Sequence, residues 1–236
     1  MEIIIIFLVI ILIIIFLKSN FQSSTIEDQL FNGLEWADYR IGDVYMLSKK
    51  SPHYSDPTHP ENLNYHKTKY PGTIASEYIN KNTSDKNPRL LLDIIDSKTK
   101  DKSKHPDTLF LHMRVGDVIC NLDDPWIKKV NGPMYYSKMG DTTWWNNILD
   151  YIHKKQIRRV VIVAGTHKNQ CLRQSAKYIE DRKAFLIKSF PGITVDYRLG
   201  QSPDDDIIMC SNVEHFITTG GGFGKLIKEI NITKKY

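Results

Sequence analysis

The residues of this chain that are best suited to binding or catalysis lie in the stretch HMRVGD, which contains His112, Arg114, Gly116 and Asp117. The apolar residues around it predict a buried strand over residues 108–114, and alternate side chains of a strand share a face, so His112 and Arg114 point the same way. A guanidinium is planar and can hold two phosphate oxygens at once. Gly116 permits a tight turn, and Asp117 either holds the arginine or accepts a proton from a hydroxyl group. The stretch predicts an anion site at a strand tip; an Arg114–Asp117 pair that merely ends the strand is the alternative.

A second candidate site is the glycine-rich stretch TTGGGFG, which follows one predicted strand and begins a predicted helix. Unpaired N–H groups at a helix start bind anions, and glycines let a ligand approach the backbone closely. The stretch matches neither the P-loop nor G-x-G-x-x-G, so a flexible turn is the alternative. Upstream, the acidic run DDD contains Asp205 and stands where negative charge favours a helix start. The candidate residues of the glycine-rich stretch are Thr219, Gly220, Gly221, Gly222 and Phe223.

Regular alternation of predicted strands and helices places both stretches in one domain. Near-continuous apolar runs such as VVIV indicate a parallel sheet with helices on both faces. We therefore expect a doubly wound, Rossmann-like α/β domain over residues 106–236, with ligands at the carboxyl ends of its strands. Thr166 and His167 follow the second strand and are candidates for ribose or base contacts, and Arg198 ends the third. The predicted strands cover residues 108–114, 158–165, 193–198 and 215–219, and the predicted helices cover residues 142–155, 169–187, 204–212 and 222–230.

The chain begins with an uninterrupted apolar run over residues 3–17. A bilayer core asks for about 20 residues, so the run is short for a membrane span. We predict a single-pass membrane anchor over residues 1–20, with a cleaved signal peptide as the alternative. Lys18 on its C-terminal flank by itself argues for a cytosolic body under the positive-inside rule.

The region between the anchor and the α/β domain, residues 21–105, is predicted to be a polar stalk, SNFQSSTIEDQ, followed by a small mixed region. The mixed region is expected to contain a strand over residues 44–47 and two helices. Thr73 is placed to cap a helix over residues 74–79, and Asn87 with Pro88 is placed to begin a helix over residues 89–95.

Bulk composition limits the classes of protein that this chain can belong to. Its 236 residues are 41% hydrophobic and 25% charged, which predicts an ordinary globular body. A net charge of +5 with scattered lysines does not indicate a nucleic-acid-binding stripe. Three widely spaced cysteines do not form a disulfide framework, and neither C-x-x-C nor H-E-x-x-H is present, so no metal site is expected. We detect no internal repeat.

Taken together, H-x-R-x-G-D and the later pattern from Asp205 through HFITTGGGFG resemble the α-1,2-fucosyltransferases and the wider superfamily that contains the protein O-fucosyltransferases and the α-1,6-fucosyltransferases. The resemblance covers roughly residues 108–230. It implies the donor half of a GT-B-like, inverting, metal-independent glycosyltransferase that needs no cofactor and moves fucose from GDP-fucose to a glycan or protein acceptor. It also implies a lumenal body in the secretory pathway. Arg114 would neutralise the β-phosphate, the amides of Gly220, Gly221 and Gly222 would hold the diphosphate, and Asp205 would seat the nucleotide.

The chain departs from the family pattern at several positions. Val115 stands where the family has a second arginine, Gly221 and Gly222 replace a serine or threonine, and KLIKEI replaces a tryptophan-rich helix. Asp117, Asp123 and Asp124 are candidates for a general base. These departures leave a second interpretation open, in which the chain is a membrane-tethered, non-catalytic protein that binds a nucleotide or a glycan on the same fold.

Overall fold

The computed structural model describes residues 25–31, 33–46, 63–82, 86–101, 103–120, 142–166 and 171–234. Several predictions lie outside these residues, among them the anchor over residues 1–20, His167, and the candidate bases Asp123 and Asp124. Within the described part of the chain, no helix is long and apolar enough to cross a membrane.

A four-stranded parallel sheet forms the centre of the protein, in the order β3-β2-β1-β4. The chain starts in the middle of the sheet and moves outward in both directions, and this arrangement is consistent with a Rossmann-like fold. The prediction of an α/β protein with a parallel sheet is confirmed. The strands are β1 (Thr108–His112), β2 (Arg159–Ala164), β3 (Thr194–Leu199) and β4 (His215–Thr218).

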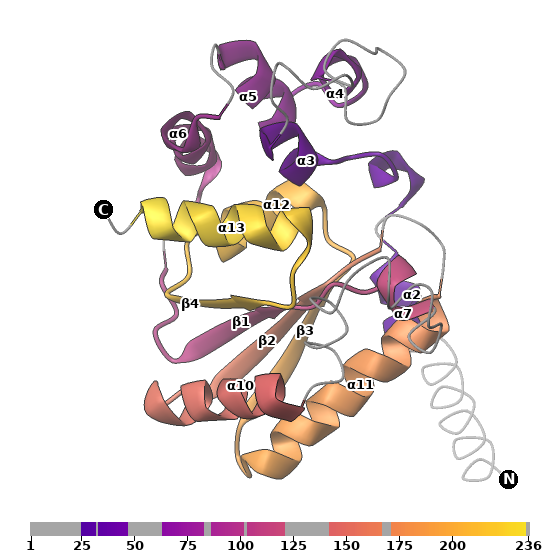
Figure 1. Ribbon diagram of the computed structural model, residues 1–236, viewed down its shortest axis with the longest axis vertical. Helices are drawn as coiled ribbons and strands as arrows, with labels where there is room; N and C mark the ends of the chain where they lie inside the picture. The colour runs from indigo at the N-terminus through magenta and orange to yellow at the C-terminus, as the bar shows by residue number, and fades with distance from the viewer. Residues whose placement is uncertain are drawn as a thin grey trace, which may run out of the picture.

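Helices cover both faces of this sheet, as Figure 1 shows. Alternate residues of β1 enter two different apolar clusters, because Leu109 and Leu111 face one layer while Phe110 faces the other. One layer contains α10 (Thr142–Lys154) and α11 (Leu172–Ser189). The other contains α3 (Ile41–Met46), α4 (Leu63–Lys69), α5 (Ile74–Lys81), α6 (Pro88–Lys98), α12 (Pro203–Cys210) and α13 (Gly221–Thr233). The short helices α2 (Ile26–Leu30), η1 (Leu34–Trp36) and α7 (Asp117–Cys120) complete the described elements.

The helices predicted between the anchor and the sheet are confirmed, but the strand is wrong. The Thr73 side chain caps α5, and Asn87 caps α6 with Pro88 in its first turn. Residues 41–46 form helix α3 instead of containing the start of a strand. Its buried residues Ile41, Val44 and Tyr45 recur at helical spacing, and their burial overrides the strand preference of Val44.

The predicted stalk ends earlier than expected, because its last residues fold into the body. Thr25 and Asp28 form a reciprocal capping box at the start of α2. Leu30 at the end of α2 is fully buried, and its carbonyl oxygen accepts a hydrogen bond of 2.8 Å from the backbone N–H of Thr166. The polar residues of this segment suggested that it is exposed. Instead, the buried Leu30 side chain and the backbone hydrogen bond to Thr166 hold it beside the end of β2.

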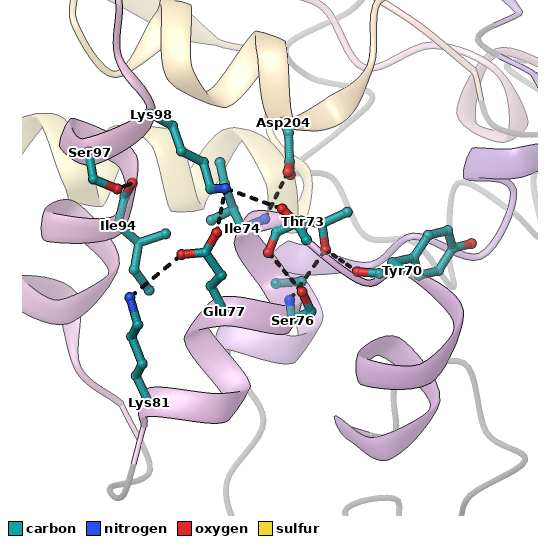
Figure 2. A network of polar contacts seen from close by, with 12 residues as sticks. Tyr70, Thr73, Ile74, Ser76, Glu77, Lys81, Ile94, Ser97, Lys98 and Asp204 are labelled. Carbon is teal, nitrogen blue, oxygen red and sulfur yellow. Dashed lines mark hydrogen bonds and ion pairs between the residues drawn. The ribbon is translucent and has the colours of Figure 1, made fainter.

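The region before β1 is part of the same core as the sheet. Ile74 and Ile95 share an apolar cluster with Phe110 and Val163 of the strands. A polar network then links α5, α6 and α12, as Figure 2 shows. In it, the Asp204 carboxylate accepts a hydrogen bond of 2.8 Å from the N–H of Ile74 and another from the Tyr39 hydroxyl.

Glu77 lies at the centre of the other half of this network. Its carboxylate is paired with Lys98 of α6 and lies 3.6 Å from the ammonium of Lys81. The hydrogen bond from Lys98 lowers the pKa of Glu77, which is therefore held in its charged form. Lys98 also donates a hydrogen bond of 3.2 Å to the carbonyl of Gly72, just before α5. These contacts fix α5 and α6 relative to each other and leave them as one layer over the sheet.

Replacing Leu30 with alanine tests whether α2 belongs to the fold. Because Leu30 is fully buried, we expect Leu30→Ala to lower the free energy of unfolding by about 2–5 kcal/mol, measured by urea denaturation. Ile232→Ala is the matched control, because Ile232 is 51% exposed, and should change stability by no more than about 0.5 kcal/mol. Equal effects of the two substitutions would show that α2 is not packed.

Candidate functional site

A cleft of about 300 Å³ opens at the carboxyl ends of β1 and β2, between the start of α13 and the start of α3. Its position agrees with the rule that parallel α/β sheets bind ligands at this edge. Most of the residues predicted from the sequence line it together. They are His112, Arg114, Gly116, Asp117, Thr166, Gly220, Gly221, Gly222 and Phe223.

Arg114 lies just beyond β1 and is held there by its backbone. Its N–H donates a hydrogen bond of 2.8 Å to the hydroxyl of Thr219, which is fully buried behind the cleft and supports the site from there. The guanidinium lies 3.3 Å from the carboxylate of Asp117, and its side chain is 33% exposed. Gly116 between them has a φ of +80°, a conformation that glycine adopts without strain. The turn therefore presents a charged fork to the cleft on a fixed backbone.

The start of α13 forms the neighbouring wall of the cleft. Gly220 is its N-cap and, as a glycine, makes no side-chain hydrogen bond to the first turn. Gly221 has a φ of +86°, and a Cβ there would come within 3.1 Å of the Arg114 side chain. The backbone conformation favours glycine at this position, and a side chain there would also crowd Arg114. First-turn amides and a guanidinium meet at one place, which is a chemically suitable arrangement for an anion.

His112 is buried at the back of the cleft in the uncharged form. Its Nδ1 lies 2.9 Å from the Thr218 hydroxyl, and its ring packs beside Phe223 with 5.5 Å between ring centroids. Burial first, and then the nearby charge of Arg114, together lower the pKa of His112 to about 4. His112 therefore contributes hydrogen bonding and shape at neutral pH, and Arg114 contributes the charge.

Asp205 does not belong to the cleft, and this prediction is corrected by one residue. Asp205 accepts a hydrogen bond of 2.7 Å from the Ser202 hydroxyl, outside the cleft lining, at the exposed start of α12. Asp206 lines the cleft instead, and its carboxylate accepts a hydrogen bond of 2.7 Å from Arg198. Burial raises the pKa of Asp206 to about 6, against the opposing effect of Arg198. The helical turn directs Asp204 toward α5, Asp205 toward solvent and Asp206 toward the cleft, and the sequence alone does not show which of the three faces the cleft.

The sequence prediction missed the second wall of the cleft, which the segment from Tyr39 to Asp43 forms. A Cβ at Gly42 would lie 2.6 Å from the backbone carbonyl carbon of Gly222, so α3 and α13 approach closely only because residue 42 is glycine. The carboxylate of Asp43 lies directly over Gly222, 2.9 Å from where a Cβ would stand. Although the chain has no long internal repeat, a short sequence signal was present, because RIGDV at residues 40–44 has the same pattern as RVGDV at residues 114–118.

A disulfide joins the two turns that border the cleft. Cys120 at the end of α7 is bonded to Cys171 at the start of α11, and Cys210 remains a buried free thiol. Close to this bond, the N–H of Gly116 donates a hydrogen bond of 3.0 Å to the buried Ser175 hydroxyl of α11. An odd number of cysteines leaves at least one unpaired, and that one is Cys210; spacing alone did not indicate the pair of Cys120 and Cys171.

Thr166 lies where the two turns and α2 meet, and it is 4% exposed. Its hydroxyl has no hydrogen-bond partner among the described residues, although it borders the cleft. A buried hydroxyl without a partner is costly, so a ligand atom that reached it would be favoured. His167, its predicted companion, lies outside the described residues. In the same described part of the chain, no group of three or more histidine, cysteine or acidic side chains could hold a metal ion.

The fold and the cleft define a class: an α/β protein with a parallel sheet and an anion-suited site at its carboxyl edge. No protein-family model, curated protein or solved structure matches the chain. The resemblance to fucosyltransferases therefore stays a prediction that rests on the motifs quoted above.

The low pKa of His112 predicts a specific pH response. Because its folded pKa of about 4 lies below the ordinary value of 6.5, the unfolded chain takes up a proton that the folded protein refuses as the pH falls through this window. His112 should therefore stay neutral at pH 5.5 in histidine ¹⁵N NMR. The free energy of unfolding should fall as the pH is lowered from 6.5 to about 4, because only the unfolded chain is protonated there. The substitution Arg114→Gln removes the neighbouring positive charge and should raise the titration midpoint of His112. A midpoint at or above the ordinary value would contradict the buried geometry.

The disulfide predicts a redox effect on stability. The bond closes a loop with a sequence separation of 51 residues, so the variant with both Cys120→Ser and Cys171→Ser should lose about 2–4 kcal/mol of unfolding free energy. Thermal melts with and without dithiothreitol would measure it. The reductant should lower the melting temperature of the wild type and leave that of the double variant unchanged; a wild type that does not respond would mean that the two thiols are not bonded.

Proposed function

We propose that this chain is a membrane-anchored glycosyltransferase that moves a sugar from a nucleotide donor to a glycan or protein acceptor, with GDP-fucose as the donor. The observation that carries the proposal is the meeting of Arg114 with the uncapped, glycine-rich start of α13 in one cleft at the carboxyl edge of the sheet. The same residues carry the resemblance to the fucosyltransferases, so geometry and motif support one assignment.

The proposed reaction needs charge stabilisation more than any other catalytic effect. A bond forms between an acceptor oxygen and the anomeric carbon, the bond from that carbon to the β-phosphate oxygen breaks, and the nucleoside diphosphate leaves with both bonding electrons. Arg114 and the first amides of α13 would stabilise the charge that grows on the departing phosphate. The acceptor proton passes to a carboxylate at the cleft, with Asp117 the candidate within the described residues. Asp206 would take the nucleotide-seating role first given to Asp205.

The membrane and compartment parts of the proposal rest on other features. The apolar run over residues 3–17 supports an anchor. The disulfide between Cys120 and Cys171 supports an oxidising compartment, because such bonds persist in secreted and lumenal proteins and are rare in the cytosol. A body in the lumen of the secretory pathway is therefore favoured over the cytosolic orientation that Lys18 suggests.

One observation favours a second function, a membrane-tethered protein that binds a nucleotide or glycan without turnover. Val115, which replaces the second arginine of the family pattern, is 5% exposed and packs in the apolar core. The carboxylate of Asp117 lies 3.3 Å from the guanidinium of Arg114 and is already engaged in that ion pair. A protein with these features could keep the nucleotide site and lack the chemistry.

Arg114 is the residue on which the proposed function is tested. We expect Arg114→Ala to lower sugar transfer from GDP-fucose by about 10²-fold or more, the usual effect of losing one charge-stabilising group in an active site. Arg114→Lys keeps the charge but not the planar fork and should also lose activity. Transfer assays with the purified full chain in detergent would measure both, and GDP should raise the melting temperature of the wild type more than UDP does.

Arg89→Ala is the matched control, because Arg89 has a side chain that is 74% exposed and lies on α6 away from the cleft. It should leave transfer unchanged. Circular dichroism would establish that all variants are folded. Binding of GDP without turnover on any acceptor would support the non-catalytic function, and a folded, fully active Arg114→Ala protein would remove the donor-site assignment altogether.

A further inference from the structure

We propose that Arg40 is the second phosphate-binding arginine of the cleft, so that the site is built for a diphosphate held between two walls. This inference rests on the proposed function, because it takes the cleft to be a nucleotide site. Arg40 comes from the region before the sheet, and Arg114 comes from the end of β1. Both line the same cleft of about 300 Å³.

The backbone holds Arg40 at this position. Its carbonyl oxygen accepts a hydrogen bond of 2.8 Å from the N–H of Val44 in the first turn of α3. Two residues further on, Gly42 lies against the backbone of Gly222 with no room for a side chain. The position of Arg40 relative to the start of α13 is therefore set by backbone packing and does not depend on the arginine side chain itself.

The guanidinium of Arg40 is available for an anion. It donates a hydrogen bond of 3.3 Å to the carbonyl of Tyr39, and it forms no ion pair with a carboxylate of the described residues. The nearby carboxylate of Asp38 is already held by Lys69 at 2.6 Å and by the Tyr65 hydroxyl at 2.7 Å. Arg40 thus lines the cleft with a charge that no acidic group of the described residues neutralises by direct contact.

Two carboxylates of the cleft are paired with arginines other than Arg40. Asp117 is paired with Arg114, and Asp206 is paired with Arg198. Asp43 lies over Gly222, at the wall where α3 meets α13. A ligand that carries two linked phosphoryl groups would place one against each of Arg40 and Arg114. A monophosphate has only one such group to offer.

The repeated sequence pattern supports an equivalent role for the two arginines. In both RIGDV and RVGDV the arginine precedes a buried aliphatic residue, a glycine and an aspartate in the first turn of a short helix. The aliphatic residues, Ile41 and Val115, point into the two apolar clusters on opposite faces of the sheet. An arginine at position 115 would therefore have to enter a core, and Arg40 supplies the second cation from the facing segment.

Calorimetry with GDP, GMP and inorganic pyrophosphate tests this assignment. We expect the wild type to bind GDP about tenfold more tightly than GMP, because GMP lacks the second phosphoryl group and its charge-assisted contact with an arginine. Arg40→Gln should weaken GDP and pyrophosphate binding by about tenfold or more and change GMP binding by less than about threefold, which removes most of the difference between the two nucleotides. Arg89→Gln, on the exposed face of α6, is the control and should behave as the wild type does.

The outcomes separate this inference from the proposed function. If Arg40→Gln binds GDP as tightly as the wild type does while Arg114→Gln binds it weakly, the role of Arg40 is overturned and the nucleotide site stands. If the wild type binds none of the three ligands and does not bind UDP, the proposed function fails as well. If Arg40→Gln melts at a lower temperature, Arg40→Lys is the second variant, because it keeps the charge and removes the planar guanidinium. An unchanged preference for GDP over GMP in a folded Arg40→Lys protein would contradict a contact of the Arg40 guanidinium with two phosphate oxygens.

Discussion

The contact between Gly42 and Gly222 is the constraint on which the candidate site depends. Any side chain at position 42 would meet the backbone of α13 at 2.6 Å, so the two helices pack backbone against backbone. That approach brings Arg40 and Asp43 to the edge of a sheet whose first strand starts more than 60 residues later. The start of α3 therefore lies opposite the start of α13, and the two enclose a cleft at the end of the strands. Without this contact, the end of β1 would present Arg114 to solvent.

The sheet edge combines an apolar core with polar groups that are kept in defined states. Leu109 and Leu111 of β1 are fully buried, whereas His112 at its end is buried and uncharged. Asp206 is buried as well, and its burial raises its pKa while Arg198 holds it. Such groups cost stability unless they are paired. Their concentration at one end of the sheet, beside the unpartnered hydroxyl of Thr166, is typical of a site organised for a ligand.

Local patterns predicted most of the fold and half of the cleft. The alternation of side chains along β1 predicted which residues share a face of the strand, and Thr73 and Asn87 were correctly predicted as the N-caps of two helices. The missed features all depend on partners distant in sequence. Helix α3 forms because its apolar face meets α13, and Leu30 is buried where α2 packs against α11. Cys120 meets Cys171 only after the sheet has formed. Asp206 replaced Asp205 because a helix rotates each residue by about 100°, and only the packed helix shows which one faces inward.

The same packing argues against treating residues 106–236 as a separate nucleotide-binding unit. Phe110 and Val163 of the sheet share their apolar cluster with Ile41, Ile74 and Ile95, so the helices before β1 are one of the two layers that the sheet requires. The described residues before β1 are helical apart from turns and a single bridge at Phe31. In this part of the chain, the region before the sheet is a helical layer that also forms one wall of the cleft. The cleft and the core are therefore linked through α3, whose apolar face enters the core while its polar start lines the cleft.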